Sequence, residues 1–129
     1  MAWRWYEMTD KNEVITIPDK GLEEAIKYEL NLNPNCEITK DNIKSLRWLD
    51  ASNKGILDLT GLDNAINLEE LYLGYNQIED ISTLSELTNL KILNLSNNQI
   101  QDIKVLSDLI NLKKLYLNNN KIDDISLLL

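Results

Sequence analysis

Residues 68–89 read LEELYLGYNQIEDISTLSELTN, and residues 90–111 read LKILNLSNNQIQDIKVLSDLIN. The two segments have the same length of 22 residues, and they place Leu, Asn, Ile and Asp at the same positions. The shared unit is L-x-x-L-x-L-x-x-N-x-I-x-D-I-x-x-L-x-x-L-x-N. Self-similarity at a fixed period in this range is the signature of a repeat architecture. The flanking sequence keeps the same register, so the first leucine of each unit recurs as Leu46, Leu68, Leu90 and Leu112.

The spacing inside the unit predicts a short strand followed by an asparagine ladder. The alternation at Leu71-Tyr72-Leu73 points the leucines inward and the tyrosine outward, as on a strand. Asn76, Asn98 and Asn120 then stack, and each amide is expected to bond backbone groups of neighbouring turns, at a cost of ~1–3 kcal/mol if left unpaired. One unit cannot close a core alone, but stacked units bury a continuous column of Leu and Ile.

The first unit departs from the pattern, and the residues before it do not repeat. Lys54 stands at the ladder position and Ala51 replaces a leucine, as expected of a turn that abuts a cap. We therefore divide the chain into an N-terminal extension (1–13), a helical cap (14–45) and four repeats (46–67, 68–89, 90–111 and an incomplete 112–129).

The predicted cap contains two helices joined by a turn. Pro18 and Asp19 begin the first helix. The Asn33-Pro34-Asn35 segment predicts the turn, and Thr39 is placed to cap a second, short helix. We expect these elements to cover the first turn of the column. The apolar face of the first helix comprises Leu22, Ala25, Ile26 and Leu30.

Composition narrows the classes of function. A net charge of −8 repels phosphate backbones and anionic lipid, so nucleic acid and membrane surfaces are poor partners. The chain has no histidine, which excludes Ser-His and Cys-His nucleophile pairs and imidazole metal sites. The single Cys36 excludes an intrachain disulfide, and a lone cysteine is more often inert than a nucleophile. We expect a binding protein without a cofactor, and no enzyme.

The repeats resemble the 22-residue leucine-rich repeats of the bacterial internalins, notably at 76–82 (NQIEDIS) and 98–103 (NQIQDI). Ile17-Pro18-Asp19 with the following apolar positions is similar to the helical N-terminal cap of that family. The resemblance covers roughly Val14 to the end. It implies an α/β fold: a right-handed leucine-rich-repeat solenoid with a short parallel sheet on its concave face and 3₁₀ or extended segments outside. It also implies a secreted or cell-surface protein whose concave face binds proteins, although the first residues lack the apolar run of a signal peptide.

The outward positions of the predicted concave face are the third, fifth, seventh and eighth of each unit. Four of the eight aromatic residues fall on these positions, where chance would place about one. Aromatic side chains are typical anchors of protein interfaces, although strands also favour them. The candidate binding residues are Trp48, Tyr72, Tyr75, Ile92, Asn94, Lys114 and Tyr116.

Several alternatives stay open at this point. The incomplete last repeat leaves Leu and Ile without a following unit, which favours a spacer or self-assembly unit associating through its C-terminal repeat. Trp and Tyr also stack on sugars, so glycan binding is a third hypothesis. Trp3, Trp5 and Tyr6 have no predicted role. A second column, Asp58, Asp80, Asp102 and Asp124, either accepts backbone N–H bonds at the next turn or, less favoured, binds calcium.

Overall fold

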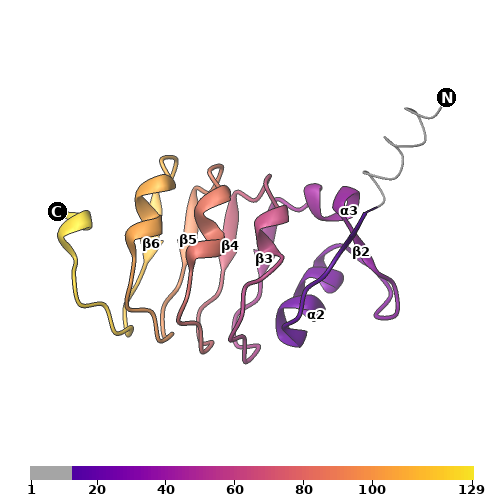
Figure 1. Ribbon diagram of the computed structural model, residues 1–129, viewed down its shortest axis with the longest axis horizontal. Helices are drawn as coiled ribbons and strands as arrows, with labels where there is room; N and C mark the ends of the chain where they lie inside the picture. The colour runs from indigo at the N-terminus through magenta and orange to yellow at the C-terminus, as the bar shows by residue number, and fades with distance from the viewer. Residues whose placement is uncertain (1–12) are drawn as a thin grey trace.

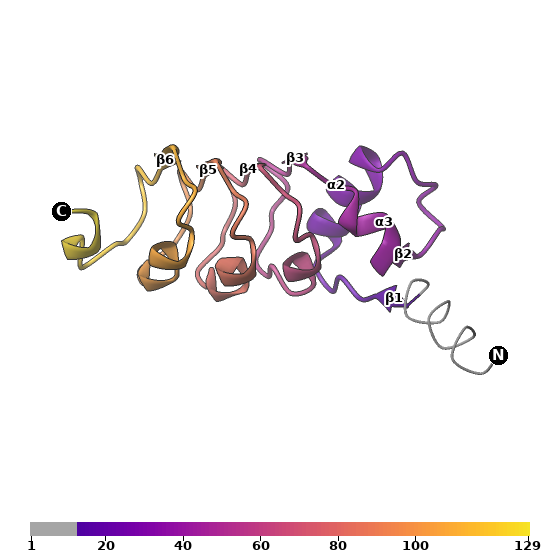
Figure 2. The same ribbon diagram turned by 90° about the horizontal axis from the view of Figure 1, so that it is seen from above.

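The computed structural model describes residues 13–129 and consists of coils stacked along one axis (Figures 1 and 2). Each of the four repeats contributes one short strand: β3 (Trp48–Asp50), β4 (Glu70–Tyr72), β5 (Ile92–Asn94) and β6 (Lys114–Tyr116). They form a parallel sheet in chain order, β3-β4-β5-β6. Residues 22 apart are direct neighbours, so that Leu49, Leu71, Leu93 and Leu115 form one row. The predicted leucine-rich-repeat solenoid is confirmed.

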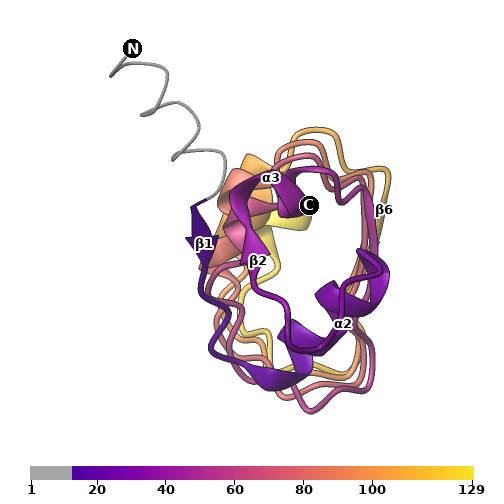
Figure 3. The same ribbon diagram turned by 90° about the vertical axis from the view of Figure 1, so that its right-hand side faces the viewer.

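Each coil closes through a 3₁₀ helix before the chain returns to the next strand. These helices are η1 (Leu62–Asn64), η2 (Ser82–Glu86), η3 (Lys104–Asp108) and η4 (Ser126–Leu128). Viewed along the stack, the coils superimpose, and the sheet that ends in β6 lies on the side of the ring opposite to β1 and β2 of the N-terminal segment (Figure 3). Its interior is almost purely aliphatic, because the inward leucines and isoleucines of the first three repeats are buried.

The predicted asparagine ladder joins successive coils. The Oδ1 of Asn76 accepts the backbone N–H groups of Lys54 and Ile56, both at 3.0 Å, and its Nδ2 donates to the carbonyl of Ala51. Asn98 repeats this arrangement one coil later, bonding Ile78 and Leu73 of the preceding coil. Each amide thus satisfies buried backbone groups that lie one repeat earlier in the chain.

A second asparagine ladder, which the sequence analysis did not assign, is formed by residues that precede the strands β4, β5 and β6 in the chain. Asn67 donates to the carbonyl of Lys44 at 2.7 Å, Asn89 to that of Ile66 and Asn111 to that of Thr88. These asparagines occupy the last position of the repeat motif. Like the buried ladder, each of them reaches back along the chain: Asn67 to Lys44 of the cap, and Asn89 and Asn111 to the preceding coil.

The cap covers the first coil as predicted. It consists of α2 (Lys20–Glu29), a two-stranded antiparallel sheet of β1 (Val14–Ile15) with β2 (Ile38–Thr39), and α3 (Lys40–Lys44). Thr39 accepts the N–H of Asn42 while the Asn42 side chain accepts the N–H of Thr39, which completes a capping box. The apolar face of α2 is buried at Leu22, Ala25 and Ile26.

Asp19 joins the cap to the first repeat. Its Oδ1 accepts the N–H groups of Gly21 and Leu22 at the start of α2, and its Oδ2 accepts those of Leu57 and Asp58. A Cβ at Gly21 would lie 2.3 Å from the carbonyl oxygen of Lys54, so only glycine lets the helix approach this closely. Lys54, which occupies the asparagine-ladder position of the first repeat, is therefore in contact with the cap.

Replacing the buried Asn98 by alanine should destabilise the protein by ~1–3 kcal/mol, because the N–H of Ile78 and the carbonyl of Leu73 would be stranded between coils. The measurement is the urea midpoint followed by circular dichroism. The matched control is Asn35→Ala, at an exposed turn position, which should leave the midpoint unchanged. Equal midpoints for Asn98→Ala and the wild type would show that the ladder contributes nothing.

Candidate functional site

The outward side of β3–β6, together with the seventh and eighth positions of each repeat, forms the surface that we call the strand face. The strands alternate as expected, since the middle residue of each points into the core and its two neighbours point outward. In register, the third positions form the row Trp48, Glu70, Ile92 and Lys114, and the fifth positions form the row Asp50, Tyr72, Asn94 and Tyr116.

Trp48 and Tyr72 form an aromatic pair on this face. Their ring centroids lie 6.0 Å apart and the ring planes are tilted by 52°. The Tyr72 hydroxyl donates to Glu70 Oε1 at 2.8 Å. This bond to Glu70, followed by desolvation and by the charges of Glu70 and Asp50, raises the pKa of Tyr72. Tyr72 is therefore held in place by its neighbours.

The other candidate residues of the strands lie apart from this pair. Tyr116 is 45% exposed, and the fifth position of β5, occupied by Asn94, separates it from Tyr72. Ile92, expected to be exposed, is half-buried between the positions of Glu70 and Lys114. The candidate anchors consequently form a Trp48–Tyr72 pair and a separate Tyr116, without joining into one continuous apolar patch.

Two of the four seventh positions, in the second and third repeats, are less accessible than their outward assignment suggested. Gly74 is buried, and Ser96 is only 7% exposed. Ser96 donates its hydroxyl to Asn118 Oδ1 at 2.7 Å, and its backbone N–H donates to Asn94. These residues serve the turn after the strand, because the chain there already bends toward the buried ladder.

The eighth position of every repeat has a left-handed backbone. Asn53, Asn97 and Asn119 have φ values of 55°, 58° and 58°, and asparagine tolerates this region well. Tyr75 adopts the same conformation, with φ of 59°, while its side chain is 66% exposed. A bulky residue in this region is strained. Sequence reasoning picked Tyr75 for its ring but missed the backbone requirement, although asparagine recurs at three of the four positions.

A row of charges borders the strand face at the second positions of the repeats. Glu69 bonds Arg47 at 3.2 Å (Oε2 to Nη1) and Lys91 at 2.9 Å (Oε1 to Nζ). The hydrogen bond from Lys91, its charge and the bond from Arg47 hold the pKa of Glu69 below its usual range. These two basic side chains are thus engaged by a carboxylate outside the strand face.

The aspartate column bonds backbone N–H groups, as the sequence favoured. In every repeat the carboxylate accepts the N–H two residues later, at 2.8 to 2.9 Å. The hydrogen bond from the Thr60 hydroxyl, followed by that from its backbone N–H, lowers the pKa of Asp58. The bonds from Ser82 and Ser126, the backbone N–H first in each case, lower the pKa of Asp80 and Asp124. Across residues 13–129, His, Cys, Asp and Glu side chains nowhere gather in a group of three or more that could hold a metal ion.

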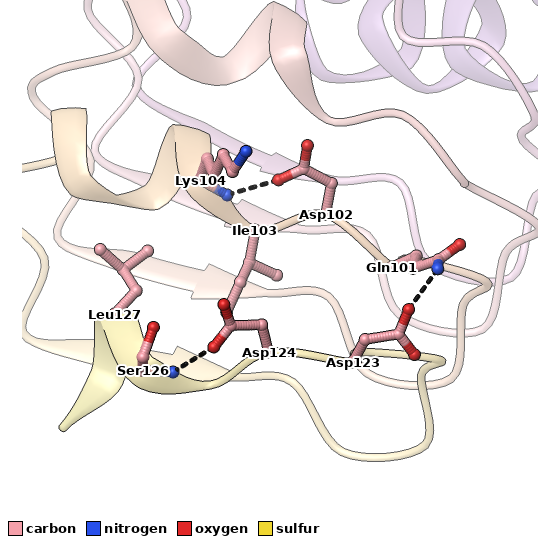
Figure 4. Close-up of a pocket in the computed structure, with 8 residues that line it drawn as sticks. All are labelled: Gln101, Asp102, Ile103, Lys104, Asp123, Asp124, Ser126 and Leu127. Atoms are coloured by element: carbon pink, nitrogen blue, oxygen red, sulfur yellow. Dashed lines mark hydrogen bonds between the residues drawn. The ribbon is translucent and has the colours of Figure 1, made fainter.

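A pocket of about 500 Å³ lies between the third and fourth repeats, away from the strands (Figure 4). Three hydrogen bonds join residues that line it: Lys104 donates its backbone N–H to Asp102, Ser126 donates its own to Asp124, and Gln101 donates to Asp123. A similar pocket of about 590 Å³ lies one repeat earlier. Since the pocket recurs with the repeat, we interpret it as a consequence of stacking.

The remaining candidates lie elsewhere or outside the structure. Cys36 is exposed in the turn before β2, rather than buried among apolar groups. Trp3, Trp5 and Tyr6 lie outside the described residues. In the last repeat, Leu115, Leu117 and Ile122 are half-buried, and Ile125 and Leu128 are 53% and 49% exposed. Every helix among residues 13–129 is too short or too polar to cross a membrane.

Comparison with known proteins agrees with this architecture. The family model "Leucine Rich repeats (2 copies)" matches residues 44–86 and again 88–129. The chain therefore belongs to the leucine-rich-repeat family. Within that family it is internalin-like, as the solved structures indicate. A comparison with curated proteins gives no match.

Two solved internalins of Listeria monocytogenes are similar to the chain. The internalin inlF is 38% identical over 85% of this chain and 33% of its own, with a TM-score of 0.82. Internalin C2 is 30% identical over 84% of this chain and 58% of its own, with a TM-score of 0.62. A structure of the CBM51-2 and INT domains of Clostridium perfringens ZmpB is 43% identical over 71% of this chain and 19% of its own, with a TM-score of 0.64. The chain thus spans between a fifth and three fifths of the length of these structures.

Most substitutions lower the free energy of unfolding, but the strained backbone at Tyr75 predicts that one substitution there raises it. Tyr75→Asn should stabilise the protein by about 1 kcal/mol, because asparagine suits the left-handed conformation that its counterparts adopt. The urea midpoint measures this gain. Tyr28→Asn, at an exposed tyrosine in α2, is the matched control and should not stabilise. A lower midpoint for Tyr75→Asn would mean that the ring makes contacts that outweigh the strain.

Proposed function

We propose that the chain is a protein- or peptide-binding module that acts through the strand face, which corresponds to the concave face expected from the sequence. The observation that carries the proposal is the concentration of aromatic side chains there. Trp48, Tyr75 and Tyr116 expose 43%, 66% and 45% of their surfaces, and Tyr72 packs beside Trp48. Exposed Trp and Tyr offer large contact areas with few rotatable bonds, which suits an interface anchor.

The architecture of the family supports the same proposal. Stacked repeats create extended surfaces that solenoid proteins use for binding partners. Four strands at ~4.8 Å spacing span only about 15 Å, which is narrow beside a standard interface of ~800 Å² per partner. We therefore favour an extended segment of a partner, rather than a large globular surface, as the ligand of these four repeats.

Removing two aromatic rings tests the proposal. Tyr72→Ala combined with Tyr116→Ala should abolish capture of the partner from the organism's own surroundings, while the circular dichroism spectrum stays unchanged. Loss of the rings removes two of the four aromatic anchors without touching the buried column. Tyr28→Ala, an 86% exposed tyrosine on the cap, is the control and should capture as the wild type does. Undiminished capture by the double variant would remove the strand face from consideration.

A second candidate function is self-association through the fourth repeat, supported by the exposure of Ile125, Leu128 and the partly exposed Leu117. Burying apolar surface contributes ~25 cal/mol per Å², against association costs of ~4 to over 15 kcal/mol. This candidate predicts concentration-dependent association in sedimentation, which Leu117→Glu should prevent. A chain that stays monomeric at millimolar concentration would contradict it. Glycan binding by the same aromatic rings is an alternative use of the strand face.

A further inference from the structure

The first two strands bring two aromatic rings and two carboxylates together in a square arrangement. Trp48 lies in register with Glu70, and Asp50 lies in register with Tyr72. The rings therefore occupy one diagonal, with centroids 6.0 Å apart, and the carboxylates occupy the other. We call these four residues the cation corner. We propose that it binds the guanidinium group of an arginine side chain on an extended segment of the partner protein, an inference that rests on the proposed function.

The carboxylates of the cation corner have no cationic partner of their own. Among residues 13–129, neither Asp50 nor Glu70 forms an ion pair. The basic side chains nearest in sequence and register, Arg47 and Lys91, both bond Glu69 at the border of the face. Two carboxylates on neighbouring strands thus keep their negative charge uncompensated, and an added cation would find both within one site.

The hydrogen bonds of the two carboxylates leave acceptor capacity for a ligand. Asp50 accepts one bond through Oδ1, from the N–H of Ser52 at 3.0 Å. Glu70 accepts one bond through Oε1, from the Tyr72 hydroxyl. Each carboxylate therefore has its second oxygen free of any bond from residues 13–129, and a charged donor bonds such oxygens more strongly than a neutral donor does.

Both carboxylates act electrostatically on the Tyr72 ring that lies between them. The pKa of Tyr72 is raised first by its hydrogen bond to Glu70 and by desolvation, and then by the charges of Glu70, Tyr116 and Asp50. The same field favours a positive group placed against the ring faces. Cations within ~6 Å of a Trp or Tyr ring are attracted further by the ring itself.

Arginine suits the cation corner better than lysine. Its planar guanidinium stacks on aromatic faces and presents five donors in a rigid fork, so that it can meet carboxylates on two sides of a ring pair. A pocket of about 340 Å³ adjoins Trp48, and the other residues that line it are Glu29, Leu30, Ser45, Leu46 and Arg47. It offers a place beside the ring for the chain that carries the arginine, since the Arg47 side chain is already bonded to Glu69.

The test uses N-acetyl-arginine methylamide as the probe and the indole N–H signal of Trp48 as the readout in NMR titrations. Saturable shifts of this signal are expected, and they should weaken with added salt because charges drive the binding. N-acetyl-citrulline methylamide is the uncharged comparison and should produce no saturable shift. Equal shifts from citrulline, or none from arginine up to its solubility limit, would overturn the proposal.

Neutral side chains of the same shape test the role of the two carboxylate charges in binding without disturbing the fold. Asp50→Asn with Glu70→Gln should raise the Kd for the arginine probe about tenfold or more, because the charge-assisted bonds are lost while each side chain keeps one oxygen that can accept a hydrogen bond. The third repeat shows that asparagine serves the turn equally well, because Asn94, two strands along at the position of Asp50, accepts the N–H of Ser96 at 3.0 Å. The control, Glu86→Gln with Asp108→Asn, makes the same charge change on η2 and η3 and should leave the Kd unchanged.

The outcome for the partner separates this proposal from the general one. If capture of the partner depends on Tyr72 and Tyr116 but not on the charges of Asp50 and Glu70, the strand face binds it and the cation corner is wrong. If capture depends on neither set, the strand face is wrong as well. An unchanged Kd for the arginine probe in Asp50→Asn with Glu70→Gln would by itself overturn the cation corner.

Discussion

The structure depends on one interaction, the bond between an asparagine side chain and the backbone of the preceding coil. A narrow coil with an aliphatic interior leaves backbone N–H and carbonyl groups pointing into the core, where water cannot reach them. Asn76 and Asn98 are buried at 7% and 3% exposure and satisfy these groups with both ends of one amide. Among residues 13–129, no buried side-chain N or O atom is left without a partner. The ladder thus joins successive coils inside the stack, as the paired strands do on the strand face.

Much of the fold could be predicted from the sequence, because a period of 22 residues places identical side chains in one row. The inward row Leu49, Leu71 and Leu93 and the aspartate bonds follow directly from that register. The cap also followed local rules, since Asp19 and Thr39 are strong helix-capping residues. Periodicity does not predict how the contacts of one residue in a row differ from those of its equivalents in the other repeats.

The candidate site shows that limit. Trp48, Tyr72 and Tyr116 were found as outward aromatics, but the tilt between the first two rings depends on a cross-strand contact that no spacing rule gives. The strain at Tyr75 was missed because the asparagines at the same position of the other repeats were not assigned to a left-handed turn. Asp19 was assigned to a helix start, whereas its second oxygen serves a loop 38 residues later. Such long-range contacts follow from how the cap packs on the first coil.

The direction of both asparagine ladders has a consequence for how the chain is made. Every ladder side chain reaches back along the chain, Asn67 to Lys44 of the cap and the others to the coil before them. A coil leaving the ribosome therefore lacks its full set of bonds until the next 22 residues emerge, roughly 1 to 4 s later at ordinary rates of synthesis. The cap, which needs no later asparagine to form α2, is the first surface on which a coil can settle. Assembly then proceeds from the N-terminus, each new repeat completing the one already in place.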